Sequence, residues 1–265
     1  MKIKANAKIN LVLNVLEKKE EYHIIDFIMA PISLYDEIEI NFSEKDEVIC
    51  EKINQEDNLV YKMLKELKKK YGIKKNFSIK IKKNIPIGAG LAGGSSDCAF
   101  VLMALNKMLD LKLTKEELIE FSRGFGSDIA FFFINKIARV QGYGEKIRTI
   151  DKKINKKIIL INPLIELSTK KVYQTHKLTK NHGNIEAFIL SDNYEDYLHN
   201  DLEESAIKHE PIIQEIKNDL IKMKLKPIMS GSGCSVFAFI EHFKKEEYEF
   251  LEKKYSYVKI VEVLC

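Results

Sequence analysis

The chain has 265 residues, of which 45% are hydrophobic, so it is long enough to bury one large core or two modest ones. Its 43 basic and 39 acidic residues give a net charge of +4, and arginine occurs only at positions 123, 139 and 148. A surface of mixed sign that is poor in arginine argues against nucleic-acid recognition, which favours clustered, bidentate arginines.

The cysteine and histidine spacing gives no sign of a metal site. The four cysteines form no C-x-x-C pair, which argues against a zinc site or a disulfide framework and favours a reduced, cytoplasmic setting. The six histidines show no ligand spacing on a shared helix face, so we expect no metal held by side chains. Because the sequence opens directly into an alternating strand, we expect no signal peptide, and no apolar run reaches the ~20 residues that span a bilayer. We therefore expect neither a membrane nor a nucleic-acid partner.

The first predicted element is a strand over residues 2–15. Apolar and small residues occupy every second position from Ile3 to Val15, the period of a half-buried strand. Lys8 and Asn10 lie on the other face and point the same way. On composition alone this polar face would be an ordinary solvent-exposed one. A second alternating run predicts another strand over residues 37–42.

Asn58 is placed to cap a predicted helix over residues 59–71, which ends at Gly72. A third strand, over residues 77–82, follows this helix.

A glycine-rich loop, PIGAGLAGGSSD at residues 86–97, connects this strand to an amphipathic helix over residues 98–109, with Ser96 or Asp97 as the expected cap. A helix N-terminus offers unpaired N–H groups, and glycines let the backbone approach a ligand, so we predict that the loop binds phosphate. A side chain at Gly90 would then take the place of phosphate. The predicted binding residues are Pro86, Ile87, Gly88, Ala89, Gly90, Leu91, Ala92, Gly93, Gly94, Ser95 and Ser96.

Two other phosphate-binding patterns fit this loop less well. Gly88, Gly90 and Gly93 spell G-x-G-x-x-G, but a dinucleotide fold needs an acid at the end of a strand about 20 residues later, and Asp110 follows a helix instead. The Gly-Lys-Ser/Thr of a P-loop does not occur here.

Thr114 and Glu117 form a capping box for the next helix, and Asp128 then opens another within Gly-Ser-Asp-Ile-Ala-Phe-Phe. An aspartate in such a position is more often a cap than a catalyst. A strand over residues 137–150, bent around Tyr143, leads to a basic polar stretch at residues 151–157. We place a domain boundary there, between domains 1–153 and 154–265.

The second domain is predicted to contain a strand at residues 158–162, a helix that carries Tyr173, an Asn-Asp-Leu-Glu segment at 200–203, and a Ser-Gly-Ser-Gly turn at 230–233 between strands. Taken in order, these motifs resemble the GHMP small-molecule kinases, and within them the 4-diphosphocytidyl-2-C-methyl-D-erythritol kinase family. The resemblance covers nearly the whole chain. It implies a two-lobed α+β fold, with a ribosomal-S5-domain-2-like ATP-binding lobe, a ferredoxin-like C-terminal lobe and the site in a cleft.

The resemblance also implies roles for individual residues. Lys8 and Asp128 match the family's catalytic lysine and general base, and Asn58 matches a segment near its adenine pocket. The substrate residues that it implies are Asn10, Tyr22, His23, Tyr143 and Tyr173, with Tyr22 and Tyr173 on either side of cytosine and His23 at its edge. Ala92 and Ala130 stand where the family commonly has glycine and proline.

The implied reaction is transfer of phosphate from ATP, accompanied by Mg²⁺, to the 2-hydroxyl of 4-diphosphocytidyl-2-C-methylerythritol in the non-mevalonate isoprenoid route. Because no carboxylate is an obvious Mg²⁺ ligand, we expect Ser95 or Ser96 and phosphate oxygens to hold the ion. We expect a monomer or weak homodimer. The alternatives are another GHMP kinase, disfavoured by the Tyr-His pair, and a nucleotide sensor without turnover, disfavoured because Lys8 and Asp128 are both present.

Overall fold

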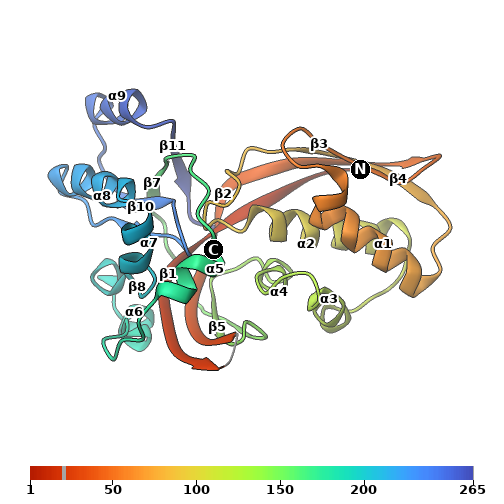
Figure 1. The fold of residues 1–265 in the computed structure, drawn as a ribbon, viewed down its shortest axis with the longest axis horizontal. Coiled ribbons are helices and arrows are strands. Elements are labelled where there is room, and N and C mark those ends of the chain that lie inside the picture. Colours follow the sequence, from red (N-terminus) through yellow and green to blue (C-terminus); the bar gives the residue numbers. More distant parts are fainter. Residues whose placement is uncertain (20–21, 265) are drawn as a thin grey trace. The chain divides into compact units, whose positions relative to one another are not determined.

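The computed structural model describes residues 1–19 and 22–264, and the side chain of Tyr22 is not among the parts described. Groups of strands and groups of helices are interspersed along the chain (Figure 1). The strands are β1 (Lys2–Lys19), β2 (Tyr22–Ser43), β3 (Glu47–Cys50), β4 (Asn76–Lys82), β5 (Ala138–Gly142), β6 (Lys146–Thr149), β7 (Lys157–Asn162), β8 (His199–Asn200), β9 (Ile228–Met229), β10 (Val236–Ile240) and β11 (Tyr257–Glu262). The α-helices are α1 (Leu59–Tyr71), α2 (Gly93–Met108), α3 (Lys115–Ser122), α4 (Ile129–Phe132), α5 (Thr169–Thr175), α6 (Ile185–Leu190), α7 (Glu203–His209), α8 (Ile212–Lys222) and α9 (Lys245–Lys254).

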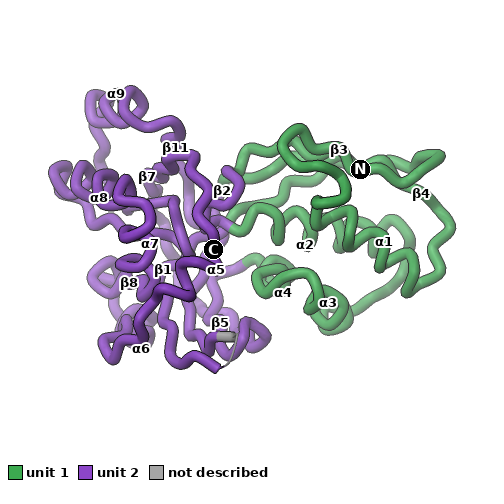
Figure 2. The backbone as a smooth tube through the Cα atoms, viewed as in Figure 1, with its two compact units in different colours: residues 1–7, 34–85, 92–135 green, residues 8–33, 86–91, 136–265 purple. Residues whose placement is uncertain are grey.

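The chain divides into two compact units, each built from discontinuous segments (Figure 2). Unit 1 comprises residues 1–7, 34–85 and 92–135, and unit 2 comprises residues 8–33, 86–91 and 136–265. This division differs from the contiguous domains 1–153 and 154–265 expected from the sequence. The physical reason is that β1 and β2 are long strands whose residues 8–33 pair with β5 and β8.

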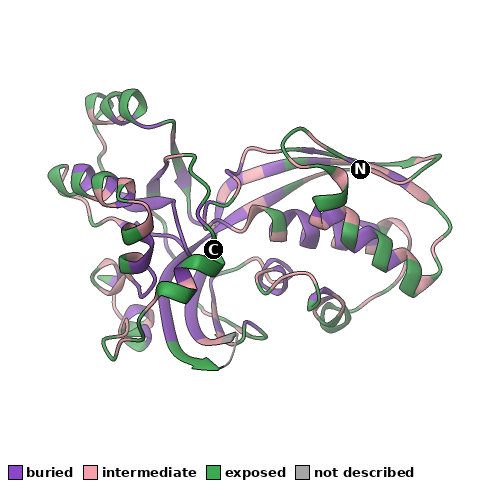
Figure 3. Cartoon of the chain, viewed as in Figure 1, coloured by how far each residue is buried: buried purple, intermediate pink, exposed green. Residues whose placement is uncertain are grey.

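Unit 1 is a sheet with helices on one face. The second half of β2 pairs antiparallel with β4, from Glu37 opposite Lys82 to Ser43 opposite Asn76, and β3 is parallel to β4. Helices α1 and α2 lie against one face of this sheet and turn their apolar sides to it (Figures 1 and 3). The predicted helix between Asn58 and Gly72 and the strands around residues 37–42 and 77–82 are confirmed.

Unit 2 contains the remaining strands. The first half of β2 pairs antiparallel with β5, and β8 is parallel to β1 at Val12 and Leu13. A separate antiparallel sheet has the order β11-β7-β10-β9, and α8 packs on β10. The bent strand predicted over residues 137–150 is the β5–β6 pair, and the strand predicted at 158–162 is β7.

The start of α2 corrects a prediction. The helix begins at Gly93, with Ala92 before it at a left-handed φ of 54°, so Ser96 and Asp97 lie inside the helix and do not cap it. Both side chains have partners elsewhere in unit 1 that outweigh the local capping preference. Ser96 Oγ donates to the carbonyl of Asn6 at 2.6 Å, and Asp97 pairs with Lys83. In the described part of the chain, no helix is both long and apolar enough to cross a membrane.

Candidate active site

Lys8 and Asn10 lie side by side on β1, as the strand periodicity predicts. Lys8 Nζ donates to Asn10 Oδ1 at 2.6 Å and to the carbonyl oxygen of Gly90 at 3.0 Å. Lys8 is only 4% exposed and Asn10 only 1%, so this polar face is not an ordinary solvent-exposed one. A buried ammonium needs such partners, because an unpaired charge away from water is costly.

The Ser-Gly-Ser-Gly turn at residues 230–233 packs against the glycine loop. Ser230 Oγ donates to the carbonyl of Gly90 at 3.1 Å and accepts from the backbone N–H of Asn10 at 3.2 Å. A Cβ atom on Gly90 would lie 2.1 Å from the carbonyl oxygen of Ser230. Substitution at Gly90 therefore meets the backbone of this turn first, which corrects the expectation that its side chain would simply take the place of phosphate.

Asn200 supports the same turn, a role that sequence reasoning missed. Its Nδ2 donates to the carbonyl oxygens of Met229 at 2.7 Å and of Gly231 at 2.9 Å. Asp201, the next residue, accepts a 2.7 Å hydrogen bond from the backbone N–H of Val15 on β1. The Asn-Asp-Leu-Glu motif thus connects the turn to the strand that carries Lys8. The only sequence signal for it was the family resemblance.

The backbone of the glycine loop has the form of an anion site. Gly88, Gly90 and Ala92 have positive φ values of 63°, 74° and 54°, and they alternate with residues of negative φ. Alternation of this kind turns successive N–H groups toward one concave side, which is a common way to bind phosphate. The next element of the chain is α2, whose N-terminus has unpaired N–H groups of its own. The residues present therefore fit the phosphates of a nucleotide.

The two serines at the start of α2 differ in environment. Ser96 is fully buried, and its hydroxyl donates a hydrogen bond to the carbonyl of Asn6. Ser95 is half-buried, and its Oγ lies 3.6 Å from the position that a Cβ would take on Gly126. Ser95 therefore lies beside the Gly-Ser-Asp turn that carries Asp128.

Asp128 precedes α4 but makes no side-chain capping hydrogen bond to it. Asn58, by contrast, has a clear structural role, because its Oδ1 accepts a 2.9 Å hydrogen bond from the backbone N–H of Val60 and caps α1. The structure thus confirms that Asn58 caps a helix, while its part in adenine binding stays a prediction. A capping role for Asp128 is not supported.

The predicted cytosine residues are partly brought together. The rings of His23 and Tyr173 lie in contact, with centroids 4.8 Å apart at 46°. Burial, and then the charges of Lys18 and His176, lower the pKa of His23 below its ordinary value. Tyr143 is 50% exposed, at the β5–β6 turn, and the side chain of Tyr22 lies outside the described residues. Within residues 1–19 and 22–264, no group of three or more His, Cys, Asp or Glu is arranged to hold a metal ion.

Comparison with known proteins gives a consistent result over the full length. Residues 58–136 match the model of the GHMP kinases N terminal domain. The chain is 39% identical to the 4-diphosphocytidyl-2-C-methyl-D-erythritol kinase of Clostridium kluyveri, over 98% of this chain and 99% of the relative. It is 37% identical to the enzyme of the same name from Clostridium beijerinckii, over 100% of both.

Solved structures agree with this assignment. A crystal structure of 4-(cytidine 5'-diphospho)-2C-methyl-D-erythritol kinase matches with a TM-score of 0.85 and 26% identity, over 99% of each chain. The mevalonate kinase of Methanococcus jannaschii matches with a TM-score of 0.68 and 17% identity, over 100% of this chain and 98% of that one, which shows the shared fold alone. The chain belongs to the 4-diphosphocytidyl-2-C-methyl-D-erythritol kinase family and has the mixed α+β fold of the GHMP kinases.

Proposed function

We propose that this chain transfers the γ-phosphoryl group of ATP to the 2-hydroxyl of 4-diphosphocytidyl-2-C-methyl-D-erythritol, a step in non-mevalonate isoprenoid precursor synthesis. The structural observation that carries the proposal is the carbonyl of Gly90, which accepts hydrogen bonds from both Lys8 Nζ and Ser230 Oγ. Three segments far apart in the sequence, the lysine strand, the glycine loop and the late glycine turn, meet at this one residue. A protein that only bound nucleotide would not need to place a buried lysine at its phosphate loop.

The glycine loop, residues 86–96, is proposed to hold the phosphates of ATP through backbone N–H groups. The positive φ values at Gly88 and Gly90 and the N-terminus of α2 support this role. Because the Ser96 hydroxyl already has a partner, Ser95 is the serine that we propose to contact phosphate or Mg²⁺. When bound, Mg²⁺ would neutralise charge on the phosphate oxygens. Asn58 is proposed to lie near adenine.

Asp128 is proposed to act as the general base. As the 2-hydroxyl oxygen forms its bond to the γ-phosphorus, the bond from phosphorus to the leaving ADP oxygen breaks, and the hydroxyl proton passes to the Asp128 carboxylate. Lys8 is proposed to stabilise the negative charge that moves during this step, and its bonds to Asn10 and Gly90 fix the direction of its side chain.

Recognition of cytosine is proposed for Tyr22, His23 and Tyr173, with Tyr143 at the edge of the site. The lowered pKa favours the neutral form of the His23 ring, in which one ring nitrogen donates and the other accepts. A neutral imidazole can therefore read both donor and acceptor groups on a base edge. The contact between His23 and Tyr173 supports their common role.

A turnover assay tests the proposal. ATP is offered with the cytidyl substrate and, separately, with galactose, homoserine and mevalonate. We expect turnover with the cytidyl substrate in preference to the other three. Turnover with one of the others instead would indicate a different GHMP kinase, and ATP binding without any turnover would indicate a sensor. We further propose that the enzyme acts in the cytoplasm as a monomer or weak homodimer.

A further inference from the structure

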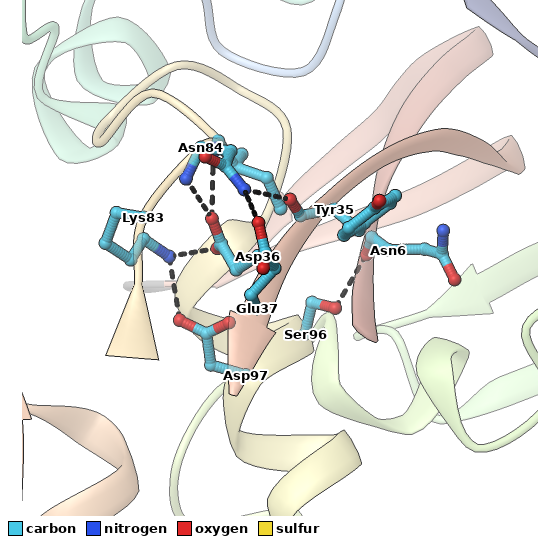
Figure 4. Close-up of polar contacts among 9 residues, drawn as sticks. Asn6, Tyr35, Asp36, Glu37, Lys83, Asn84, Ser96 and Asp97 are labelled. Carbon is cyan, nitrogen blue, oxygen red and sulfur yellow. Dashed lines mark hydrogen bonds and ion pairs between the residues drawn. The ribbon is translucent and has the colours of Figure 1, made fainter. Parts of the chain in front are cut away.

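Unit 1 contains a buried cluster of charges close to the residues that precede and follow the glycine loop. Lys83 follows β4 and points between Asp36 of β2 and Asp97 of α2 (Figure 4). Its Nζ donates to Oδ2 of Asp36 and, at 2.7 Å, to Oδ2 of Asp97. The side chains of Lys83, Asp36 and Asp97 are only 4%, 0% and 5% exposed. We call these three residues the Asp36–Lys83–Asp97 cluster.

The second oxygen of Asp36 holds the start of the loop. Oδ1 accepts hydrogen bonds from the backbone N–H groups of Asn84 at 2.6 Å and Ile85 at 2.9 Å, the two residues before Pro86. Charge-assisted bonds of this kind are about twice as strong as neutral ones. Asp36 therefore fixes the backbone at the point where the chain enters the loop.

The other end of the loop lies against the same residues. A Cβ atom on Gly93, the first residue of α2, would lie 3.0 Å from Cγ2 of Ile85 and 3.2 Å from Nζ of Lys83. A side chain at residue 93 would press on both. Asp97 lies one turn further along α2, so its bond to Lys83 joins the helix to the strand end. Both ends of the segment 86–92 are thus held at one place.

We propose that the Asp36–Lys83–Asp97 cluster positions the two ends of the glycine loop for nucleotide binding, and that Lys83 and Asp97 are positioning residues. A lysine beside a phosphate loop is commonly a phosphate ligand. Here the ammonium is buried between two carboxyl groups, and withdrawing it toward a phosphate would leave Asp36 without its counter-charge and Asp97 without its hydrogen-bond partner. The inference rests on the proposed function of the loop as the nucleotide site.

Hydrogen exchange in the nucleotide-free protein tests the positioning role without reference to activity. The probes are the backbone amides of Asn84 and Ile85. In Lys83→Met we expect these amides to exchange at least about tenfold faster, because local opening becomes easier. The matched control is Lys82→Met, which removes the neighbouring lysine. Lys82 is 72% exposed and pairs with Glu37 at the surface, so its loss should leave exchange unchanged.

Asp97→Asn covers the case in which Lys83→Met does not fold. The amide keeps the shape and an acceptor oxygen but cannot ionise, so it cannot form the charge-assisted bond to Lys83 that a carboxylate forms, and exchange at Asn84 and Ile85 should rise about threefold. Steady-state kinetics then provide the second readout. For both variants we expect KM for ATP to rise, by about tenfold in Lys83→Met, with kcat within about threefold of wild type, because neither residue touches the reacting atoms.

The outcomes separate the inference from the proposed function. Unchanged exchange in both variants overturns the positioning role. Unchanged exchange combined with a raised KM for ATP would make Lys83 a direct phosphate ligand, which also overturns it. If the wild-type protein shows no turnover and no ATP binding, the proposed function fails, while the exchange rates still decide whether the cluster holds the loop ends.

Discussion

Lys8 Nζ lies 2.6 Å from Asn10 Oδ1, and the other polar atom of that amide, Nδ2, is buried without a partner in the described part of the chain. A buried donor that is not paired costs about 1–3 kcal/mol, so we expect Asn10 Nδ2 to find an acceptor on the substrate. Asn10→Ala should lower kcat/KM for the cytidyl substrate by about 10- to 100-fold, with KM for ATP little changed.

Asn14→Ala is the matched control for this change. Asn14 lies on the same strand and is also buried, but its amide bonds the N–H and carbonyl of Gly183. Loss of the Asn14 amide should lower stability and leave kcat/KM of the folded enzyme near the wild-type value. Equal losses of kcat/KM in the two variants would mean that Asn10 acts only through packing of β1.

Asp128 offers a test of the base. Because it makes no capping bond to α4, Asp128→Asn should lower kcat by about 10² or more without the stability loss of a missing cap. Thr114→Ala breaks a capping box with Glu117 and should have the opposite effect. It should lower the free energy of unfolding by about 1 kcal/mol and leave kcat unchanged. Turnover and urea unfolding measure the two effects. Near-normal kcat in Asp128→Asn would show that the carboxylate is structural.

The sequence predicts those features of the fold that depend on neighbouring residues. The capping box at Thr114, the cap at Asn58 and the presence of a strand at β1 are local, and the structure has all of them, although residues 7–15 are buried on both faces and the strand is not half-buried there. Ser96 and Asp97 were expected to cap α2 and do not, because their partners Asn6 and Lys83 come from strands distant in the sequence.

The candidate site also depends on contacts between residues that are distant in the sequence. Periodicity placed Lys8 and Asn10 on one face, but only the structure shows that this face is buried, since Ser230, 220 residues after Asn10, lies against it. The discontinuous units were not predictable from composition either. They arise because β1 and β2 are long enough to pair with different strands along their two halves, and no shift in composition marks the change.

Substitution of Gly94 distinguishes an effect on helix stability from an effect on ligand binding. Its φ is not positive, and a Cβ there would meet no atom within 4 Å, so Gly94→Ala should raise stability by up to about 1 kcal/mol. If phosphates approach the N-terminus of α2, the added methyl should weaken ATP binding by about tenfold. Gly124→Ala, also with no atom within 4 Å, is the control and should leave ATP affinity unchanged. Calorimetry decides, and wild-type ATP affinity in Gly94→Ala would contradict the proposed phosphate position.

Tyr22 and His23 are expected to contribute differently to base recognition. Stacking is insensitive to base identity and is worth about 1–3 kcal/mol per base, so Tyr22→Ala should weaken binding of cytidine and uridine analogues alike. Edge hydrogen bonds discriminate, so His23→Ala should chiefly reduce the preference for cytidine. Binding of both analogues to both variants is the measurement. Equal losses throughout would mean that other groups read cytosine.

Asp97 is expected to make stability depend on pH. Burial raises its pKa to about 8, although Lys83 beside it opposes the shift, and Asp36 is the other charged group that it faces. Between pH ~4 and ~8 Asp97 has lost its proton in the unfolded chain but keeps it in the folded protein, so the contribution of Asp97 to the free energy of unfolding falls as pH rises. Asp97→Asn removes the titrating carboxyl group. The free energy of unfolding of this variant, relative to that of wild type, should therefore increase from pH 5 to pH 8, by at most about 1.4 kcal/mol per pH unit. Urea unfolding at intervals across this range is the measurement, with the exposed Asp110→Asn as control. A difference between Asp97→Asn and wild type that stays constant with pH would show that Asp97 is ionised in the folded protein and fully compensated by Lys83.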